Sequence, residues 1–173
     1  MSRNYAAKNG ASAAETKEPQ VYLPAATVYH GNYQNTGSVI GVRMCPATAR
    51  QAGYLQVELA RQLEAGSRDQ KTFHRFDWAK RITFRFSFIE AGEIVGVIRG
   101  NAESIRDGKG FRHRDAKFTL THVIDPAPGY AIKAVAEQKD GESSTVEITL
   151  TPDEAFAMGL AISASMGMMA FGC

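Results

Sequence analysis

The segment from Phe73 to Glu93 constrains the fold of this chain most strongly, because it joins a basic, aromatic cluster to a strict alternation and then to a helix start. Apolar and polar side chains take turns in the order Ile82, Thr83, Phe84, Arg85, Phe86, Ser87, Phe88. A period of two predicts a strand from Arg81 to Phe88 that buries one face. The other face carries Arg85, and Lys80 precedes the strand. We therefore expect a cationic sheet surface that can contact a polyanion, with aromatic side chains at its edge that can stack on bases.

Cationic residues gather in the middle of the chain, although the net charge of the whole sequence is only +2. Residues 71–85 hold five Lys or Arg and one acid, and residues 99–117 hold six and three. From residue 137 onward, one Lys stands against six acids. This distribution favours a polyanionic partner for the middle of the chain. A solvated surface with a chance imbalance is the alternative, because most charge runs are no more than that.

The length of 173 residues is typical of one domain, and 44% hydrophobic residues can fill a core. We expect residues 1–24, which are rich in Ala, Asn, Ser and Lys, to form a flexible N-terminal arm. Residues 25–173 would then form a single folded domain. The arm has no apolar stretch of the secretory type. We expect a cytoplasmic or nucleoid-associated protein, with organelle targeting left open because the first acid is Glu15.

The residues that usually carry catalysis or bind metals show no organised pattern in the sequence. Two cysteines, Cys45 and Cys173, give neither a disulfide framework nor metal-ligand spacing, which favours a reduced compartment. The four histidines are not spaced as ligands with Cys, Asp or Glu. No phosphate-binding loop, dinucleotide fingerprint or nucleophile elbow occurs. We expect no enzymatic activity, no metal and no cofactor.

Alternation elsewhere predicts an α+β fold made of two antiparallel sheets. Besides the strand from Arg81 to Phe88, the sequence predicts strands at Thr27–His30, Val39–Met44, Gly53–Leu59, Phe118–Ile124, Tyr130–Ala136 and Val146–Leu150. Apolar spacing predicts a short helix over Ile89–Ile98 that lies on the sheet. A loop rich in Gly, Lys and Arg is expected over Asn101–Arg114, and Asp140-Gly141 indicates a tight hairpin.

The C-terminal segment predicts a helix with an apolar surface on every side. Thr151-Pro152-Asp153-Glu154 has the spacing of a capping box with Pro at the first helical position. No charged residue follows from Ala155 to Cys173, and such a helix must be buried all round. Three solutions are open: a core helix, a membrane span and a contact between subunits. We favour self-association, since the stretch is marginal for a membrane, lacks a basic flank, and repeats small residues at a spacing that permits close packing, namely Gly159, Ser163 and Gly167.

Four segments, taken in their order and spacing, match a known pattern. They are Phe76-Asp77-Trp78-Ala79-Lys80-Arg81, Glu90-Ala91-Gly92-Glu93-Ile94, the turn from Asp125 to Tyr130, and Thr151-Pro152-Asp153-Glu154-Ala155-Phe156-Ala157-Met158. From about Val28 to Phe171 the chain resembles the Whirly family of single-stranded DNA-binding proteins, and more distantly the kinetoplastid mitochondrial RNA-binding proteins of the same fold. The resemblance implies two four-stranded antiparallel sheets packed roughly crosswise, with helices closing one end. It also implies that four copies join through their C-terminal helices.

Two motifs of that family are not intact in this chain. The Lys-Gly-Lys-Ala-Ala-Leu motif, which the family links to assembly of tetramers on long DNA, is replaced by either His30-Gly31-Asn32-Tyr33-Gln34-Asn35 or Thr36-Gly37-Ser38-Val39-Ile40-Gly41. Neither segment has a lysine. The final Gly-Trp of the helix pair is replaced by Phe171-Gly172. The higher assembly therefore stays open for this chain.

The leading interpretation is a sequence-tolerant single-stranded DNA-binding protein that acts in DNA replication, recombination or repair as a homo-oligomer, with a tetramer as the family precedent. Strand surfaces would offer aromatic faces to bases, and Lys and Arg would follow the phosphates. We expect the segment from Arg106 to Lys117 to be a mobile arm that closes over the nucleic acid, with Phe111 stacked on a base. The candidate residues are Tyr29, Tyr33, Trp78, Lys80, Arg81, Arg85, Lys109, Phe111, Arg112, Arg114 and Lys117.

These assignments have structural alternatives, and the function has alternatives as well. Trp78 beside a Phe-rich strand is typical of a core anchor, Tyr29 and Tyr33 would suit half-buried strand positions, and the basic residues would then be solvated. An RNA-binding or annealing chaperone would use the same scaffold, and a purely structural oligomer would not bind nucleic acid. An enzyme acting on a small substrate has no support, because no motif places titratable residues together.

Overall fold

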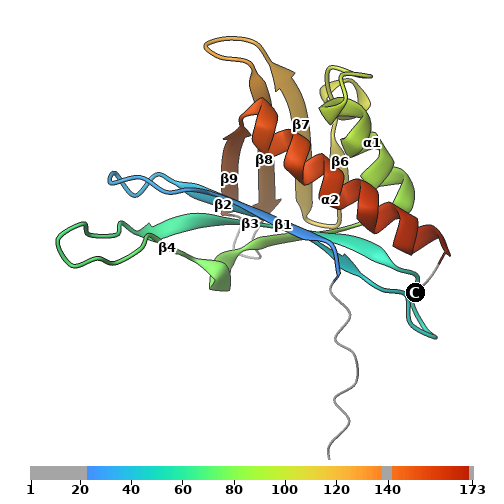
Figure 1. Ribbon diagram of the computed structural model, residues 1–173, viewed down its shortest axis with the longest axis horizontal. Coiled ribbons are helices and arrows are strands. Elements are labelled where there is room, and N and C mark those ends of the chain that lie inside the picture. The colour runs from blue at the N-terminus through green and yellow to red at the C-terminus, as the bar shows by residue number, and fades with distance from the viewer. Residues whose placement is uncertain (1–22, 138–141, 172–173) are drawn as a thin grey trace, which may run out of the picture.

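Two antiparallel β-sheets that cross one another form the framework of this protein (Figure 1). The computed structural model describes residues 23–137 and 142–171. Residues 1–22 of the expected N-terminal arm lie outside the described residues, as does the hairpin turn expected at Asp140-Gly141. Both sheets are antiparallel throughout and two longer helices accompany them, so the expected α+β class is confirmed.

The first sheet is built from the N-terminal half of the chain. Its strands are β1 (Ala25–His30), β2 (Ser38–Cys45), β3 (Tyr54–Glu64), β4 (Arg75–Phe76) and β5 (Ile82–Phe86). β1 pairs with β2 and β2 pairs with β3, while the 11-residue β3 takes two partners on its other edge. Its residues 55–59 pair with β5, and Gln62 and Glu64 pair with the short β4. The 3-10 helix η1 (Trp78–Lys80) connects these two partners.

The second sheet has four strands in sequence order, which are β6 (Phe111–His113), β7 (Ala116–Val123), β8 (Gly129–Glu137) and β9 (Ser143–Leu150). The loop expected over Asn101–Arg114 is wrong, because this stretch holds the 3-10 helix η2 (Ile105–Gly108) and then β6. Between them, Gly110 has a φ of 70° and lies against the backbone of Phe118, where a side chain would not fit. A strand of 3 residues is too short to show a period in the sequence.

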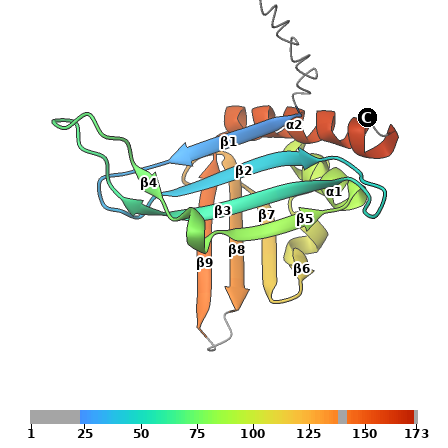
Figure 2. The same ribbon diagram turned by 90° about the horizontal axis from the view of Figure 1, so that it is seen from below.

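The two sheets cross (Figure 2), and their inner faces bury an aromatic core between them. Phe84 and Phe86 project from β5, Phe111 from β6 and Phe118 from β7, and none is more than 2% exposed. The centroid of the Phe86 ring lies 5.1 Å from those of Phe111 and Phe118. Such ring pairs stabilise a core beyond the area that they bury. The alternation therefore predicted the buried face of β5 correctly from Ile82 to Phe86.

The strand ends two residues earlier than the alternation predicted. Ser87 leaves the sheet and caps helix α1 (Phe88–Ile98), so Phe88 becomes the first residue of the helix and is 46% exposed. The carboxylate of Glu90 completes this capping box by accepting a hydrogen bond from the backbone N–H of Ser87 at 2.9 Å. The helix expected over Ile89–Ile98 is confirmed, with one more residue at its start.

Helix α2 (Pro152–Phe171) packs beside α1 on the same side of the first sheet (Figures 1 and 2). Thr151 and Glu154 form the expected capping box through three mutual hydrogen bonds. Gly159 is buried, and a side chain at this position would press against Ile98 of α1. This glycine therefore permits close packing within the chain, which corrects its assignment to a contact between subunits. Among the described residues, no helix is long and apolar enough to cross a membrane.

Candidate nucleic-acid interface

An open groove follows the junction of the two sheets, from the turn between β6 and β7 to the loop that precedes β2. β5, η1 and β3 form one wall, and β6, the β6–β7 turn, β7, β8 and β9 form the other. Four hollows follow one another along the groove, with volumes of about 670, 590, 330 and 450 Å³. Each hollow shares lining residues with the next, so the four form one continuous surface. These shared residues include Thr83 and Ala116, then Lys80 and Ser144, then Arg61 and Val146.

Positive charge is concentrated at one end of this groove. Arg85, Arg112 and Arg114 line the first hollow together with a single acid, Asp115. In each of the other three hollows, acidic residues are at least as many as Lys and Arg. Guanidinium groups donate paired, charge-assisted hydrogen bonds to phosphate oxygens. The first hollow, which we call the arginine end, is therefore the part of the groove best suited to a phosphate group.

The strand β5 presents Arg85 on the outer face of the first sheet, because its neighbours Phe84 and Phe86 point into the core. The Arg85 guanidinium carbon lies 5.1 Å from the centroid of the Tyr54 ring on β3. A cation above an aromatic face is attracted by the ring and held in one orientation. No ion pair engages Arg85 among the described residues. Its charge is therefore available to a ligand.

The neighbouring Arg81 is in a different situation. Its Nε donates to the carboxylate of Glu58 at 2.5 Å, and its Nη1 donates to the backbone oxygen of Trp78 at 2.6 Å. Arg43 lies on the other side of the same carboxylate, at 3.9 Å. Because the charge of Arg81 is already compensated, Arg81 is less available to an anionic ligand than Arg85 is. Its contacts instead fix η1 at the rim of the groove.

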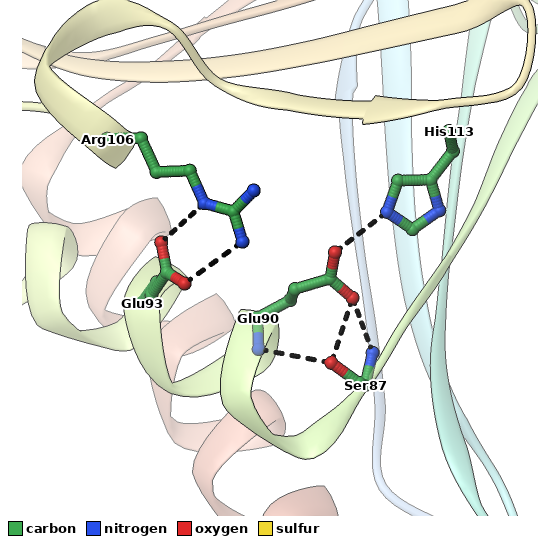
Figure 3. Close-up of polar contacts among 5 residues, drawn as sticks. All are labelled: Ser87, Glu90, Glu93, Arg106 and His113. Atoms are coloured by element: carbon green, nitrogen blue, oxygen red, sulfur yellow. Dashed lines mark hydrogen bonds and ion pairs between the residues drawn. The ribbon is translucent and has the colours of Figure 1, made fainter.

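The β6–β7 hairpin carries Arg112 and Arg114, and a contact to α1 holds this hairpin in place (Figure 3). His113 lies between these two arginines in sequence, and its Nε2 is 2.9 Å from Oε1 of Glu90. The Phe84 and Phe86 rings of β5 pack nearly perpendicular to the imidazole. The arginine end is therefore positioned by a packed and hydrogen-bonded side chain, not by a free loop.

Glu90 joins this contact to the cap of α1 (Figure 3). Partial burial alone would raise the pKa of its carboxyl group, but the hydrogen bonds that it accepts from Ser87 and His113 outweigh that effect and lower the pKa. The carboxylate therefore stays ionised at neutral pH. A second pair beside it, Arg106 and Glu93, ties η2 to α1 with two contacts of 3.3 Å.

The structure places five of the candidate residues in the lining of the groove. The five that line the groove are Lys80, Arg81, Arg85, Arg112 and Arg114. Lys117 pairs in register with Arg112, which places it on the outer face of the second sheet beside the arginine end. Lys109 is exposed directly after η2. The roles of all these residues stay predictions.

The mobile arm expected from Arg106 to Lys117 is wrong. The second half of this segment forms the paired β6–β7 hairpin, and Phe111 is 0% exposed. The guanidinium carbon of Arg106 covers this ring at 4.7 Å from its centroid. A base would reach Phe111 only if the core opened, because the ring is more stable against its aromatic neighbours than in water. Phe111 is therefore a core residue in this structure.

The other aromatic candidates do not line the groove. Tyr29 and Tyr33 are 59% and 56% exposed, which is more than the half-buried alternative assumed. The Tyr29 ring packs against Phe76 at a centroid distance of 5.6 Å. Trp78 is half-buried in η1, which has no buried residue, so it is not a core anchor. It lies at the rim of the groove, because its neighbour in η1, Lys80, is one of the lining residues.

Sequence reasoning missed two residues that shape this surface. Arg61 lines the third and fourth hollows, and its Nε donates to the backbone oxygen of Thr145 at 2.5 Å, which ties β3 to β9. It lies outside both cationic stretches, so no charge run pointed to it. Tyr54 supports Arg85 from the neighbouring strand, and this relation depends on the strand register, which the sequence does not show.

The comparison with known sequences gives no match, either to a family model or to a curated protein. Within the described residues, no group of three or more His, Cys, Asp or Glu side chains is placed to hold a metal ion.

Solved structures do resemble this one in fold. A trypanosome MRP1/MRP2 structure superposes with a TM-score of 0.63 at 13% identity, covering 87% of this chain and 88% of that chain. A guide-RNA-binding protein complex bound to a guide RNA superposes with a TM-score of 0.64 at 13% identity, covering 87% of this chain and 94% of that chain. WHY1 from Arabidopsis thaliana superposes with a TM-score of 0.56 at 16% identity, covering 89% of this chain and 87% of that chain. The crossed sheets, their strand order and these superpositions together show that this protein has the Whirly fold, as WHY1 and the trypanosome MRP1/MRP2 proteins do.

Proposed function

We propose that this protein binds single-stranded nucleic acid along the groove between its two sheets, without strong demand on the base sequence. The arginine end carries the proposal. Arg85, Arg112 and Arg114 converge on one hollow, and none of them forms an ion pair among the described residues. The guide-RNA-bound complex of the same fold supports this reading. The protein would act by binding and not by catalysis.

The groove favours contacts to the phosphate backbone over contacts to particular base edges. Guanidinium groups recognise phosphates, and these contacts position a strand without reading its sequence. Aromatic rings at Tyr54 and Trp78 lie next to the basic residues and would accept a base of any type. A single strand can turn its bases toward such rings, while a duplex keeps its bases paired and stacked. Preference for single strands follows from that difference.

DNA is the nucleic acid that we propose first, with a role in replication, recombination or repair in the cytoplasm or at the nucleoid. RNA binding or strand annealing on the same surface is the second candidate, and the guide RNA bound to a structural neighbour favours it. The groove is lined by the same cationic and hydroxyl groups for either ligand. Discrimination between the two would need a contact to the 2′-hydroxyl group.

Self-association through α2 is the last part of the proposal. The helix buries Ala155, Met158 and Ile162 against its own chain, but Phe156 is 65% exposed and Leu160 is 54% exposed. These two residues lie one turn apart, so they form one apolar stripe. A second copy of the helix would cover the stripe, and a tetramer is the arrangement that we propose. Because no residue of α2 lines the groove, assembly through α2 would leave the groove open.

Fluorescence anisotropy with a labelled 24-nucleotide strand tests the proposal at 50 and 200 mM salt. We expect the strand to bind more tightly than the same sequence as a duplex. The double variant Arg112→Ala/Arg114→Ala should bind more weakly and should lose about 1.4 units of salt slope, at about 0.7 per lost phosphate contact. Arg50→Ala/Arg99→Ala is the matched control, since these two exposed arginines do not line the groove.

The outcomes separate the parts of the proposal. Equal affinity for strand and duplex would overturn the preference for single strands. An unchanged slope in the groove variant, or an equal change in the control, would overturn the groove as the site. Matched DNA and RNA strands decide between the two ligands, and an annealing assay with complementary strands tests the chaperone activity.

A further inference from the structure

Two loops project together beyond the crossing of the sheets, at the end of the first sheet away from α1 (Figures 1 and 2). One joins β1 to β2, and the other joins the end of β3 to β4. We call residues 31–37 and 63–75 the distal arm. None of the residues that line the arginine end belongs to it. The arm is therefore separate from the arginine end, and it adjoins only the opposite end of the groove.

Phe73 is the most exposed large hydrophobic residue of the distal arm and of all described residues. It is 91% exposed, against 75% for Ile124 and 72% for Ile89. Almost the whole ring is therefore open to a partner. A single exposed apolar side chain is ordinary on a protein surface, so a functional role for Phe73 must be argued from the residues around it.

A buried amide holds the first loop of the arm to β3. Gln62 is only 7% exposed. Its Oε1 accepts the backbone N–H of Asn32 at 2.8 Å, and its Nε2 donates to the backbone oxygen of Asn32 at 2.6 Å. The same Nε2 lies 3.3 Å from Oδ1 of Asn35. A fully satisfied buried amide fixes the geometry of the loop that it bonds.

A histidine then joins the second loop to the first. Nδ1 of His74 accepts the backbone N–H of Gly66 at 3.0 Å. The imidazole lies directly on Gly31, where any side chain would collide with it. Its ring centroid is 5.4 Å from that of Tyr33. The distal arm is therefore a preformed platform in which ordering on binding would cost little.

The platform presents a cation together with its aromatic rings. Nε of Arg68 donates to the Tyr33 hydroxyl at 2.9 Å, and the Arg68 guanidinium carbon lies 5.6 Å from the centre of the Tyr33 ring. Neither Arg68 nor Lys71 forms an ion pair in the described part of the chain. Open rings beside unpaired cations are what a single-stranded polyanion with planar bases requires.

The arm begins where the groove ends. Leu63 lines the third hollow, and residues 35–37 line the fourth. β3 runs from the arginine end to the distal arm. Its Gln56 pairs with Arg85 at the arginine end, and its Gln62 pairs with Phe76 beside the arm. The two glutamines are six residues apart, which corresponds to about 20 Å of strand. A ligand that leaves the arginine end along the groove is therefore led toward the arm.

We propose that the distal arm is a second contact for the nucleic acid, in which Phe73 stacks on a base and Arg68 meets the backbone of a strand that runs out of the groove. This inference rests on the proposed function, and it adds a site for which no candidate residue other than Tyr33 had been named. Because the groove and the arm follow one another, a short strand fills the groove alone and only a longer strand reaches Phe73.

The length of the strand therefore tests the arm. We would measure affinity by anisotropy for single strands from about 4 to about 24 nucleotides, a range that covers the usual site sizes. Phe73→Ala should leave the affinity of the shortest strands that bind unchanged and weaken the longest by about 5- to 150-fold, the equivalent of one stacked base. Phe73→Trp should restore the affinity. Ile124→Ala, at a similarly exposed apolar position outside groove and arm, is the matched control.

Each outcome supports the arm or overturns it. A loss confined to long strands, with rescue by Phe73→Trp, supports it. Equal affinity at every length, or an equal loss at every length, overturns the arm while leaving the groove in place. A change of molecular mass in light scattering without a change in binding also overturns it, and would assign Phe73 to a protein contact. Failure of the wild-type protein to bind any strand is the distinct result that removes the proposed function.

Discussion

Nε2 of His113 lies 2.9 Å from Oε1 of Glu90, and this contact joins the β6–β7 hairpin to the first turn of α1. The hairpin supplies Arg112 and Arg114 to the groove, while α1 packs against α2. One carboxylate therefore lies between the proposed nucleic-acid surface and the helices. Its protonation is expected to affect both.

The stability of the fold should depend on pH through Glu90. Its pKa is lowered in the folded state, so the folded protein binds fewer protons than the unfolded chain. The stabilisation is complete above the ordinary carboxyl pKa of about 4.3 and is lost as the pH falls through the lower folded pKa. Urea unfolding between pH 7 and pH 3 should therefore show a smaller loss of stability for Glu90→Gln than for the wild type.

A charge control completes this experiment. Glu103→Gln also removes one carboxylate, from an exposed position, and so reproduces the change in net charge. A pH dependence that is equally steep in the wild type and in Glu90→Gln would contradict the assignment. Glu154 offers a second case. Partial burial alone would raise the pKa of its carboxyl group, but the hydrogen bonds from His30 and Thr151 outweigh that effect and lower the pKa. Adding Glu154→Gln should flatten the profile further.

Phe111→Ala should damage the fold and not only the binding surface. The residue is 0% exposed, and its ring lies among those of Phe86 and Phe118. Removing a buried Phe side chain typically lowers the free energy of unfolding by about 3–5 kcal/mol. Denaturant unfolding measures this directly, with Ile124→Ala as an exposed comparison. A stable variant that binds strands less tightly would instead return Phe111 to a stacking role.

Leu160→Glu should prevent the proposed self-association through α2 while leaving the single chain folded. The side chain is 54% exposed in the single chain, so the change costs little there, but it would place an unpaired charge in a helix contact. Light scattering should show a lower mass for the variant, and circular dichroism should show an unchanged helix. Ile124→Glu adds the same charge away from α2 and should keep the wild-type mass. A wild-type protein that is already monomeric at micromolar concentration contradicts the assembly.

Gln62→Leu should loosen the distal arm without opening the core. The variant keeps the size of the side chain but leaves the N–H and carbonyl of Asn32 without their partner. Such a loss typically costs about 1–3 kcal/mol. Hydrogen exchange should become faster at Asn32 and its loop, while β5 stays protected. Gln34→Leu, an exposed change in the same loop, should have no such effect, and uniform acceleration across both sheets would contradict a local role.

Local signals in the sequence predicted those parts of the fold that local chemistry determines. The alternation identified the inner face of β5, and the capping box identified the start of α2. The spacing of Ser87 and Glu90 is a capping box as well, and it explains why the strand stops before Phe88. The alternation favours a longer strand at this point, whereas the capping box favours the start of a helix. The helix forms because the capping box satisfies backbone N–H groups that would otherwise be unpaired.

The site was predicted less completely, because it depends on contacts between distant segments. Arg85 and Arg112 could be named as cations from the sequence, but only the crossing of the sheets brings them to one hollow. Phe111 looked like a loop residue because its neighbours are Gly, Lys and Arg, and only its pairing with Phe118 shows that it faces the core. Arg61 carried no signal at all, since a lone arginine in a strand is not unusual.

The double pairing of β3 sets how far apart the arginine end and the distal arm can be. Gln56 and Gln62 face the same side of this strand, with Arg85 beside one and the arm held by the other. Inserting one residue between them would turn Gln62 to the opposite face and release the arm, whereas inserting two would keep the facing and add about 7 Å. The distance between the arginine end and the distal arm can therefore change only by an even number of residues in β3.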